Sequence, residues 1–172
     1  MRLFIAIPLP GNVRAELEEN ARSLREAGCG GTFSREENYH LTLAFLGECA
    51  PGDVPALKRV MDGCRAAPME LTLAQTGCFG DTLWRGVRAP QTLAALQGSL
   101  TDALERAGFR TERRPFRPHL TLARRVTLPD GKRPADYAFP PLRFSADRMT
   151  LFLSERVAGK LTYTPLYTVQ LR

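Results

Sequence analysis

The sequence has few of the residues on which many enzyme classes depend. Its 172 residues include only two histidines, His40 and His119, one tryptophan and four isolated cysteines. Structural zinc usually needs closely spaced cysteine pairs, so the spacing argues against a metal site and favours free thiols in a reducing compartment. A glycine-rich phosphate loop, a paired-carboxylate motif and a serine-nucleophile motif are absent as well. The cysteines are Cys29, Cys49, Cys64 and Cys78.

Long hydrophobic runs are also absent. The sequence has no stretch of about 18 apolar residues, which excludes a membrane-spanning helix. The apolar start, residues 1–8, is short and lacks a cleavage site, so we interpret it as a core strand rather than a signal peptide. Residues 1–172 are predicted to form a single domain, because this length suits one core and no linker interrupts it. We expect a cytoplasmic monomer without membrane association.

The charge of the chain is uneven. The formal net charge is +6, which suits a polyanionic partner. Much of the excess lies between residues 106 and 125, where the only acidic residue is Glu112. Such a stretch is as often a plain solvated surface. Its position around His119 nevertheless favours a phosphate partner, because Arg binds phosphate oxygens in pairs. The arginines are Arg106, Arg110, Arg113, Arg114, Arg117, Arg124 and Arg125.

Both histidines open the same tetrapeptide, His-Leu-Thr-Leu, which begins at His40 and again at His119. At average residue usage, chance would place Leu-Thr-Leu after a given histidine on the order of once in a thousand cases or less. Both tetrapeptides lie in segments with a strand pattern. Alternate residues of a strand share a face, so each strand presents an imidazole and a hydroxyl on one side and two leucines on the other. Two such strands facing each other would form a cleft.

The hydrophobic pattern along the chain predicts an α+β fold. We expect two antiparallel sheets that face a central cleft, with helices packed outside, in a pseudo-symmetric arrangement. Strands are predicted at residues 2–8, 39–46, 69–75, 82–87 and 119–124, with two more near 149–153 and 167–171. Helices are predicted at 12–27, from 51 to about 64, and from about 93 to Gly108; residues 126–141 are predicted to form a mobile loop.

A cleft with two imidazoles, hydroxyls and arginines suits concerted acid–base chemistry. One neutral histidine takes a proton from a nucleophile while the other, protonated, gives one to a leaving oxygen. Thr42, Thr121 and an arginine would stabilise charge on phosphoryl oxygens. A ribose 2′,3′-cyclic phosphate meets these requirements, since its alkoxide leaving group needs a proton and departs opposite the attacking group.

Each component alone has a simpler structural explanation. A single histidine or threonine on a strand is more often structural, and only the pairing of the two motifs reverses that balance. Trp84 is expected in the core. Tyr39 and Phe116, which come shortly before the two motifs, are expected to pack rather than to stack on a base.

The paired motifs resemble those of the 2H phosphoesterase superfamily, and in particular its RNA 2′,3′-cyclic phosphodiesterases, also called 2′-5′ RNA ligases. The resemblance covers essentially the whole chain. Two features depart from the family pattern. An aromatic-proline stretch before the first motif is replaced by residues 32–35, Thr-Phe-Ser-Arg, and Gly80-Asp81 lacks a usual proline. Matching stretches are residues 2–7, 37–47, 83–87 and 116–124.

The resemblance implies a bilobal α+β fold and an enzyme that hydrolyses RNA-terminal 2′,3′-cyclic phosphates to 2′-phosphates without metal or cofactor. It implies that His40 is the proton donor to the leaving oxygen and His119 the proton acceptor from water. By the same resemblance Thr42, Thr121 and Arg124 bind the phosphate. RNA with cyclic phosphate ends, including tRNA fragments, is the expected partner, and reversible 2′-5′ ligation is implied as well.

Two other functions stay open at this stage. The chain could act on small cyclic phosphates, such as nucleotide or ADP-ribose derivatives. It could also be a non-catalytic RNA-binding module whose basic stretch follows the backbone, in which case binding would depend on salt and not on the histidines.

Overall fold

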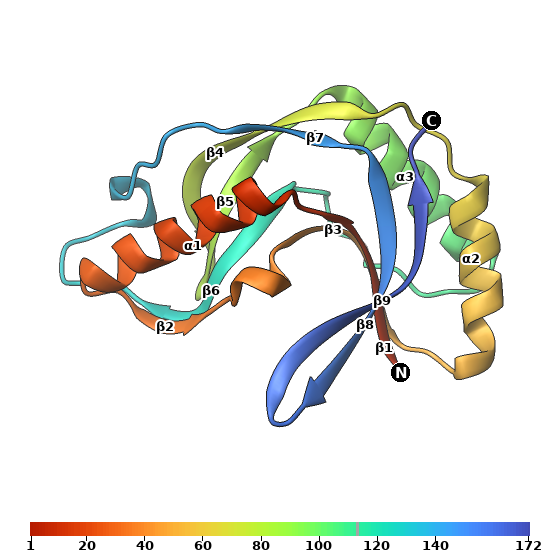
Figure 1. Cartoon of the computed structure of the whole chain (residues 1–172), viewed down its shortest axis with the longest axis horizontal. Coiled ribbons are helices and arrows are strands. Elements are labelled where there is room, and N and C mark those ends of the chain that lie inside the picture. Colours follow the sequence, from red (N-terminus) through yellow and green to blue (C-terminus); the bar gives the residue numbers. More distant parts are fainter. Residues whose placement is uncertain (113) are drawn as a thin grey trace.

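The computed structural model describes residues 1–112 and 114–172, so Arg113 of the basic stretch lies outside the described residues. The described part folds into two antiparallel sheets and three helices (Figure 1). The strands are β1 (Arg2–Pro8), β2 (Gly30–Phe33), β3 (His40–Glu48), β4 (Met69–Phe79), β5 (Thr82–Arg88), β6 (His119–Thr127), β7 (Arg143–Ala146), β8 (Arg148–Val157) and β9 (Lys160–Gln170). The helices are α1 (Gly11–Glu26), α2 (Val54–Gly63) and α3 (Gln91–Arg106).

The two sheets form two lobes, and each contains one motif strand. The first sheet has the order β3-β1-β8-β9, and the second has the order β2-β6-β5-β4-β7. Helix α1 follows β1 of the first sheet but contacts β6 of the second, whereas α3 follows β5 of the second sheet but contacts β3 of the first. Helix α2 packs on α3 and β9. Figure 1 shows α1 over the second sheet and the α2–α3 pair beside the first.

The hydrophobic core consists of alternate residues of the strands and of the apolar faces of the helices. In β1, Leu3, Ile5 and Ile7 are fully buried. The α3 stripe predicted from the sequence is buried as well, and it comprises Leu93, Leu96, Leu100 and Leu104. Gly28 and Gly108 follow α1 and α3 with φ of +87° each, a conformation that glycine adopts without strain and that ends a helix. The predicted fold class is confirmed.

Some predicted boundaries were wrong. Strand β4 extends four residues beyond the predicted end, to Phe79, and α2 begins after a 3₁₀ turn, Pro51–Asp53. The short strands β2 and β7 were missed. Each has only four residues, too few to show an alternating hydrophobic pattern. Each pairs with a longer strand, β2 with β6 and β7 with β4.

The segment predicted as a loop at residues 126–141 is partly ordered. Its first residues belong to β6, and Pro134–Asp136 form a 3₁₀ turn. The Thr76 hydroxyl donates to the carbonyl of Tyr137 at 2.8 Å, which attaches the segment to β4.

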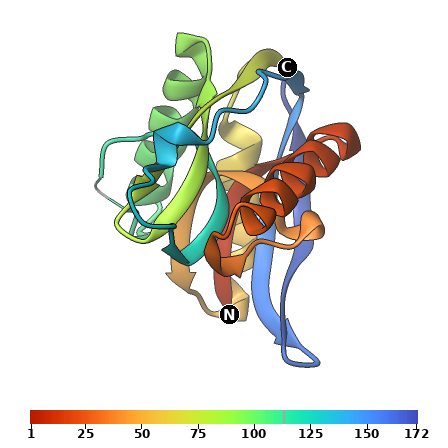
Figure 2. The same ribbon diagram turned by 90° about the vertical axis from the view of Figure 1, so that its left-hand side faces the viewer.

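The β8–β9 hairpin extends beyond the rest of the molecule at its closed end (Figures 1 and 2). None of the described helices is long and apolar enough to span a membrane.

Candidate active site

The two motif strands begin in the same way. His40 is the first residue of β3 and His119 the first residue of β6. On each strand the histidine and threonine are half-buried, while the intervening leucine is fully buried. The predicted division of the tetrapeptides into a polar and an apolar face is therefore confirmed. The histidine and threonine of each motif share one face of their strand, and β3 and β6 contact each other. We refer to the region between these two strand faces as the cleft.

Each imidazole is oriented by the backbone two residues earlier. The Nδ1 of His40 lies 2.8 Å from the carbonyl oxygen of Asn38, and the Nδ1 of His119 lies 2.6 Å from that of Arg117. A carbonyl oxygen only accepts hydrogen bonds, so in both rings Nδ1 carries the hydrogen. In the neutral ring Nε2 is then free to accept a proton, and in the charged ring it can donate one.

The two motifs share one electrostatic environment. The pKa of His40 is lowered from its ordinary value near 6.5 to about 4, mainly by burial; the carbonyl of Asn38 opposes this shift, and the charges of Arg124 and His119 add to it. Strands β3 and β6 also contact each other, although they belong to different sheets. His40 is therefore neutral at pH 7, and the imidazole of His119 and the guanidinium of Arg124 lie near enough for their charges to lower its pKa.

Arg124 reaches the cleft because of a β-bulge. In β6, Thr121 lies opposite Trp84, but the next pair is Ala123 with Leu83, so Leu122 is inserted. Leu122 and Ala123 are both fully buried, and the alternation resumes one residue out of phase. Arg124 thereby lies on the same face as His119, although a regular strand would place it on the opposite one. The register thus places His40 and Thr42 on one face of β3, and His119, Thr121 and Arg124 on one face of β6, and these two strands contact each other.

Strand β3 has an equivalent bulge. Thr42 lies opposite Ala6, and the next pair is Ala44 with Ile5. The bulge turns Phe45, five residues after His40, toward the cleft, where its ring centroid is 6.1 Å from that of Phe4. Phe45 is 43% exposed, an unusual value for a phenylalanine in a strand. It offers an uncovered aromatic face beside the histidine site.

Aromatic rings pack closely around His40. The ring of Phe4 lies 4.7 Å from the imidazole, and Tyr163 approaches its edge at 5.1 Å with an interplanar angle of 87°. Phe152 stacks on Phe4 at 5.3 Å. Burial raises the pKa of Tyr163, and the charge of Arg124 opposes the shift, so this phenol faces the same cleft. The sequence analysis did not predict Tyr163 as a site residue, because β9 carries no motif. Its ring reaches His40 only because the folded chain places β9 and β3 in the same sheet.

A second aromatic group surrounds His119. Phe79 meets the imidazole edge to face at 5.0 Å, and Trp84 lies 6.3 Å away. The prediction that Trp84 belongs to the core was wrong. It lies on the cleft face of β5 and covers Gly77, where a Cβ would come within 2.3 Å of the indole. The absence of a side chain at position 77 lets the indole lie flat on the sheet.

The two aromatic residues near the motifs pack as predicted. Tyr39 is buried, and its hydroxyl donates to the carbonyl of Leu17 in α1 at 3.4 Å. Phe116 is half-buried and packs against the core.

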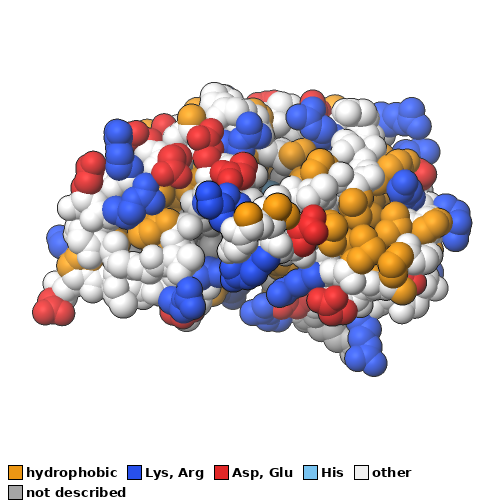
Figure 3. Space-filling model, turned by 60° about the horizontal axis from the view of Figure 1, so that its bottom comes forward, with side chains coloured by type: hydrophobic (Ala, Val, Ile, Leu, Met, Phe, Trp, Pro, Cys, Tyr) orange, Lys and Arg blue, Asp and Glu red, His pale blue; other side chains and the backbone are white. Residues whose placement is uncertain are grey.

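Positive charge borders the cleft. Arg124 and Arg125 at the end of the second motif are both exposed. In Figure 3, Lys and Arg side chains gather across the middle of the face at the lower side of Figure 1. Among the described residues, no group of three or more His, Cys, Asp or Glu is placed to hold a metal ion.

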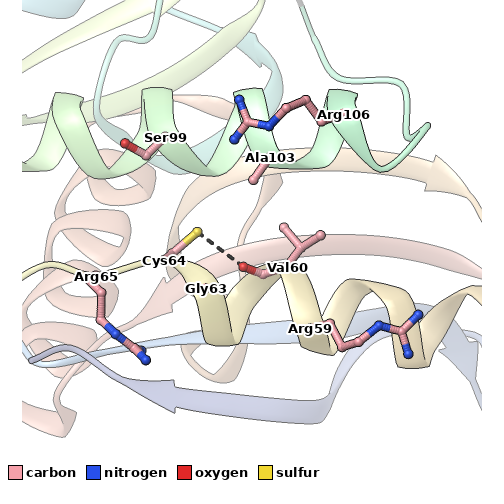
Figure 4. Close-up of a pocket in the computed structure, with 8 residues that line it drawn as sticks. All are labelled: Arg59, Val60, Gly63, Cys64, Arg65, Ser99, Ala103 and Arg106. Carbon is pink, nitrogen blue, oxygen red and sulfur yellow. Dashed lines mark hydrogen bonds between the residues drawn. The ribbon is translucent and has the colours of Figure 1, made fainter.

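One groove of the molecule lies away from the two motifs. It lies between α2 and α3, with a volume of about 490 Å³. Figure 4 shows that the guanidinium groups of Arg59, Arg65 and Arg106 are spread apart rather than directed at one point. The groove therefore lacks the converging polar groups of a ligand site.

Comparisons with known proteins agree with this geometry. The chain is 35% identical over 129 residues to the RNA 2′,3′-cyclic phosphodiesterase of Geobacillus stearothermophilus, an alignment that covers 71% of this chain and 41% of that protein. It is 32% identical over 179 residues to the enzyme of the same name from Thermotoga maritima, covering 99% of this chain and 95% of the relative. The chain thus spans less than half of the first relative and nearly all of the second.

The structural match is equally extensive. A crystal structure of Escherichia coli LigT complexed with 3′-AMP superposes with a TM-score of 0.84 at 31% identity, covering 99% of this chain and 97% of that one. Residues 13–158 match the family model described as the 2′-5′ RNA ligase superfamily. With this match and the twin motifs on facing sheets, the chain belongs to the 2′-5′ RNA ligase superfamily of 2H phosphoesterases.

Proposed function

We propose that this protein hydrolyses RNA-terminal 2′,3′-cyclic phosphates to 2′-phosphates by a two-histidine mechanism. The single observation that carries the proposal is the pair of imidazoles on the two motif strands, each oriented by a hydrogen bond from Nδ1 to a backbone carbonyl. The enzyme name of the curated relatives points to the same substrate.

The proposed reaction needs two proton transfers at opposite sides of phosphorus. Water attacks the phosphorus atom and gives a proton to Nε2 of His119. The bond from phosphorus to the 3′ oxygen breaks, and Nε2 of His40 gives that oxygen its proton. The products are a 2′-phosphate and a 3′-hydroxyl. Thr42, Thr121 and Arg124 are proposed to hold the non-bridging oxygens, on which charge accumulates in the transition state.

The proton-donor role of His40 requires a protonated ring in the substrate complex. In the substrate-free cleft its pKa of about 4 is lowered first by burial and then by the charges of Arg124 and His119. A cyclic phosphate carries one negative charge, and in this cleft it would lie among these positive groups. The bound anion thus raises the pKa of His40 and favours the charged imidazole that donation requires.

A substrate with sulfur in place of the leaving oxygen distinguishes the proton donor from the proton acceptor. If the 3′ bridging oxygen is replaced by sulfur, the thiolate leaves without a proton from the enzyme. We expect the His40→Ala variant to hydrolyse this cyclic phosphorothiolate at near wild-type rate, while His119→Ala stays inactive. With the oxygen substrate, both variants should lose about 10²–10⁴ in kcat. Recovery of His119→Ala instead would exchange the two roles.

Phe45 is proposed to support the terminal base. Its exposed ring shares a face with His40, and the two rings are linked through Phe4. An RNA 5′-hydroxyl that replaces water as the nucleophile would give a 2′,5′ linkage by the same proton transfers, so ligation is proposed as a second outcome. RNA ends, including those of tRNA fragments, are the proposed substrates, and a cytoplasmic monomer stays a prediction.

A further inference from the structure

The short turn between β2 and β3 contacts both motif strands. Strand β2 pairs with β6 as far as Phe33, opposite Ala123. Five residues follow, 34–38, and the chain passes through the buried Tyr39 before β3 begins at His40. We refer to residues 34–38 as the linking turn. It is a short covalent path from the lobe that contains His119 to the first histidine.

The linking turn is attached to the second motif at its start. The hydroxyl of Ser34 donates to the carbonyl of Thr121 at 2.8 Å, and the backbone N–H of Ser34 donates to the carbonyl of Leu122 at 2.8 Å. These carbonyls belong to the second motif and to the bulge that directs Arg124 into the cleft.

The linking turn is attached to the first motif at its end. The carbonyl of Asn38 accepts the Nδ1 hydrogen of His40. The side-chain amide of Asn38 donates to the carbonyl of Leu161 at 3.0 Å, and Arg35 donates to the same oxygen. Leu161 belongs to β9, two residues before Tyr163, whose ring packs against His40. Asn38 therefore joins the imidazole to the hairpin that encloses it.

We propose that Ser34 and Asn38 are positioning residues that fix the two histidines relative to each other. Neither needs to touch the substrate. Ser34 holds the start of the turn on the strand of Thr121, and Asn38 holds its end under His40 and against the hairpin. A displacement of about 1 Å between an acid and a base costs on the order of 10²-fold in rate, so these small contacts matter for catalysis.

The kinetic test rests on the proposed function. We expect Asn38→Ala and Ser34→Ala to lower kcat on a cyclic-phosphate RNA end by about tenfold to a hundredfold, with KM changed less than about threefold. Ser34→Thr keeps the hydroxyl and should restore most of the rate. Asn12→Ala and Ser99→Ala make the same changes at exposed helix positions and should match the wild type.

The second test is independent of activity. With only two histidines, nitrogen-15 NMR of the imidazoles shows two ring systems. We expect Asn38→Ala to move part of the His40 hydrogen from Nδ1 to Nε2 and to leave His119 unchanged, with the thermal midpoint of each variant measured alongside. Wild-type kcat in both Ala variants, or a wild-type His40 tautomer in Asn38→Ala, overturns the proposal. Absence of wild-type turnover would refute the proposed function alone, and the tautomer would still decide the role of Asn38.

Discussion

Arg124 follows His119 by five residues and yet lies on the same face of β6, because Leu122 is inserted as a bulge between them. The first motif repeats this relationship: Phe45 follows His40 by five residues after a bulge in β3. In each lobe, the histidine, the threonine two positions later and the residue five positions after the histidine thus lie on the same face of the strand. The residue five positions after the histidine is aromatic in β3 and cationic in β6, which is why we propose Phe45 as the contact for the base and Arg124 as a contact for the phosphate.

Removal of the Arg124 guanidinium should weaken transition-state binding. We expect Arg124→Ala to lose about 10²–10³ in kcat/KM, as for loss of one oxyanion-type donor. Because the charge of Arg124 lowers the pKa of His40, that pKa should also rise in the variant, as measured by NMR titration. Arg143→Ala, an exposed arginine of β7 in the same sheet, is the matched control and should change neither quantity. An unchanged kcat/KM in Arg124→Ala would remove this residue from the site.

Truncation of Phe45 should weaken the binding of substrates that carry a base and leave the binding of substrates without a base unchanged. A base stacked on an aromatic side chain contributes about 1–3 kcal/mol, so Phe45→Ala should raise KM for a cyclic nucleotide by about 5- to 150-fold. A ribose cyclic phosphate without a base should be hydrolysed equally by both proteins. Phe45→Trp should keep a low KM. Equal loss on both substrates would show that Phe45 supports the fold and not the base.

The low pKa of His40 predicts a specific pH dependence of stability. The unfolded chain binds a proton at His40 near pH 6.5, whereas the folded chain does so only near pH 4. The unfolded state therefore holds more protons between these values, and stability falls as pH decreases from 6.5 to 4, by about 3 kcal/mol in total. Above pH 6.5 this contribution does not change.

Urea unfolding of the wild type and His40→Asn at pH 7 and pH 4.5 measures this effect. The wild type should lose more stability on acidification than the variant. Parallel losses in the two proteins would mean that His40 titrates normally in the fold. In kinetics, kcat/KM should follow a bell-shaped pH profile, because one imidazole must be neutral and the other charged.

A buried arginine holds the second lobe together. Arg85 is fully buried on the face of β5 opposite the cleft. It donates to the carbonyls of Ala74 at 2.8 Å and Pro140 at 3.1 Å, and to the side chain of Asn20 in α1. Arg85→Ala leaves these acceptors unpaired and opens a cavity. We expect a loss of about 3–5 kcal/mol in urea unfolding. The exposed neighbour Arg88→Ala should lose less than about 1 kcal/mol, and a similarly small loss for Arg85 would contradict the account.

Much of the site could be predicted from local pattern. The tetrapeptides at His40 and His119 alternate with period two, so their faces follow from strand geometry alone. The leucine stripe of α3 likewise specified a helix. The placement of Arg124 came only from family resemblance, because a bulge breaks the alternation and no residue in the sequence marks it.

Other residues of the site depend on contacts between distant segments. Tyr163 contacts His40 only because β9 pairs with β8 and thereby joins the same sheet as β3. Trp84 faces the cleft because Gly77 of the neighbouring strand leaves room for its ring. Hydrophobicity alone places a tryptophan in the core, so the sequence of β5 by itself gives the wrong side.

The central claim is that two imidazoles act on one phosphorus atom, and one product assay tests it most directly. An oligoribonucleotide with a terminal 2′,3′-cyclic phosphate is incubated with the protein in excess chelator, and the phosphate isomer is identified by phosphorus NMR. The account predicts a 2′-phosphate as the sole isomer, formed at the rate seen without chelator and lost in both His40→Ala and His119→Ala. A 3′-phosphate product, dependence on metal, or full activity in either variant would contradict it.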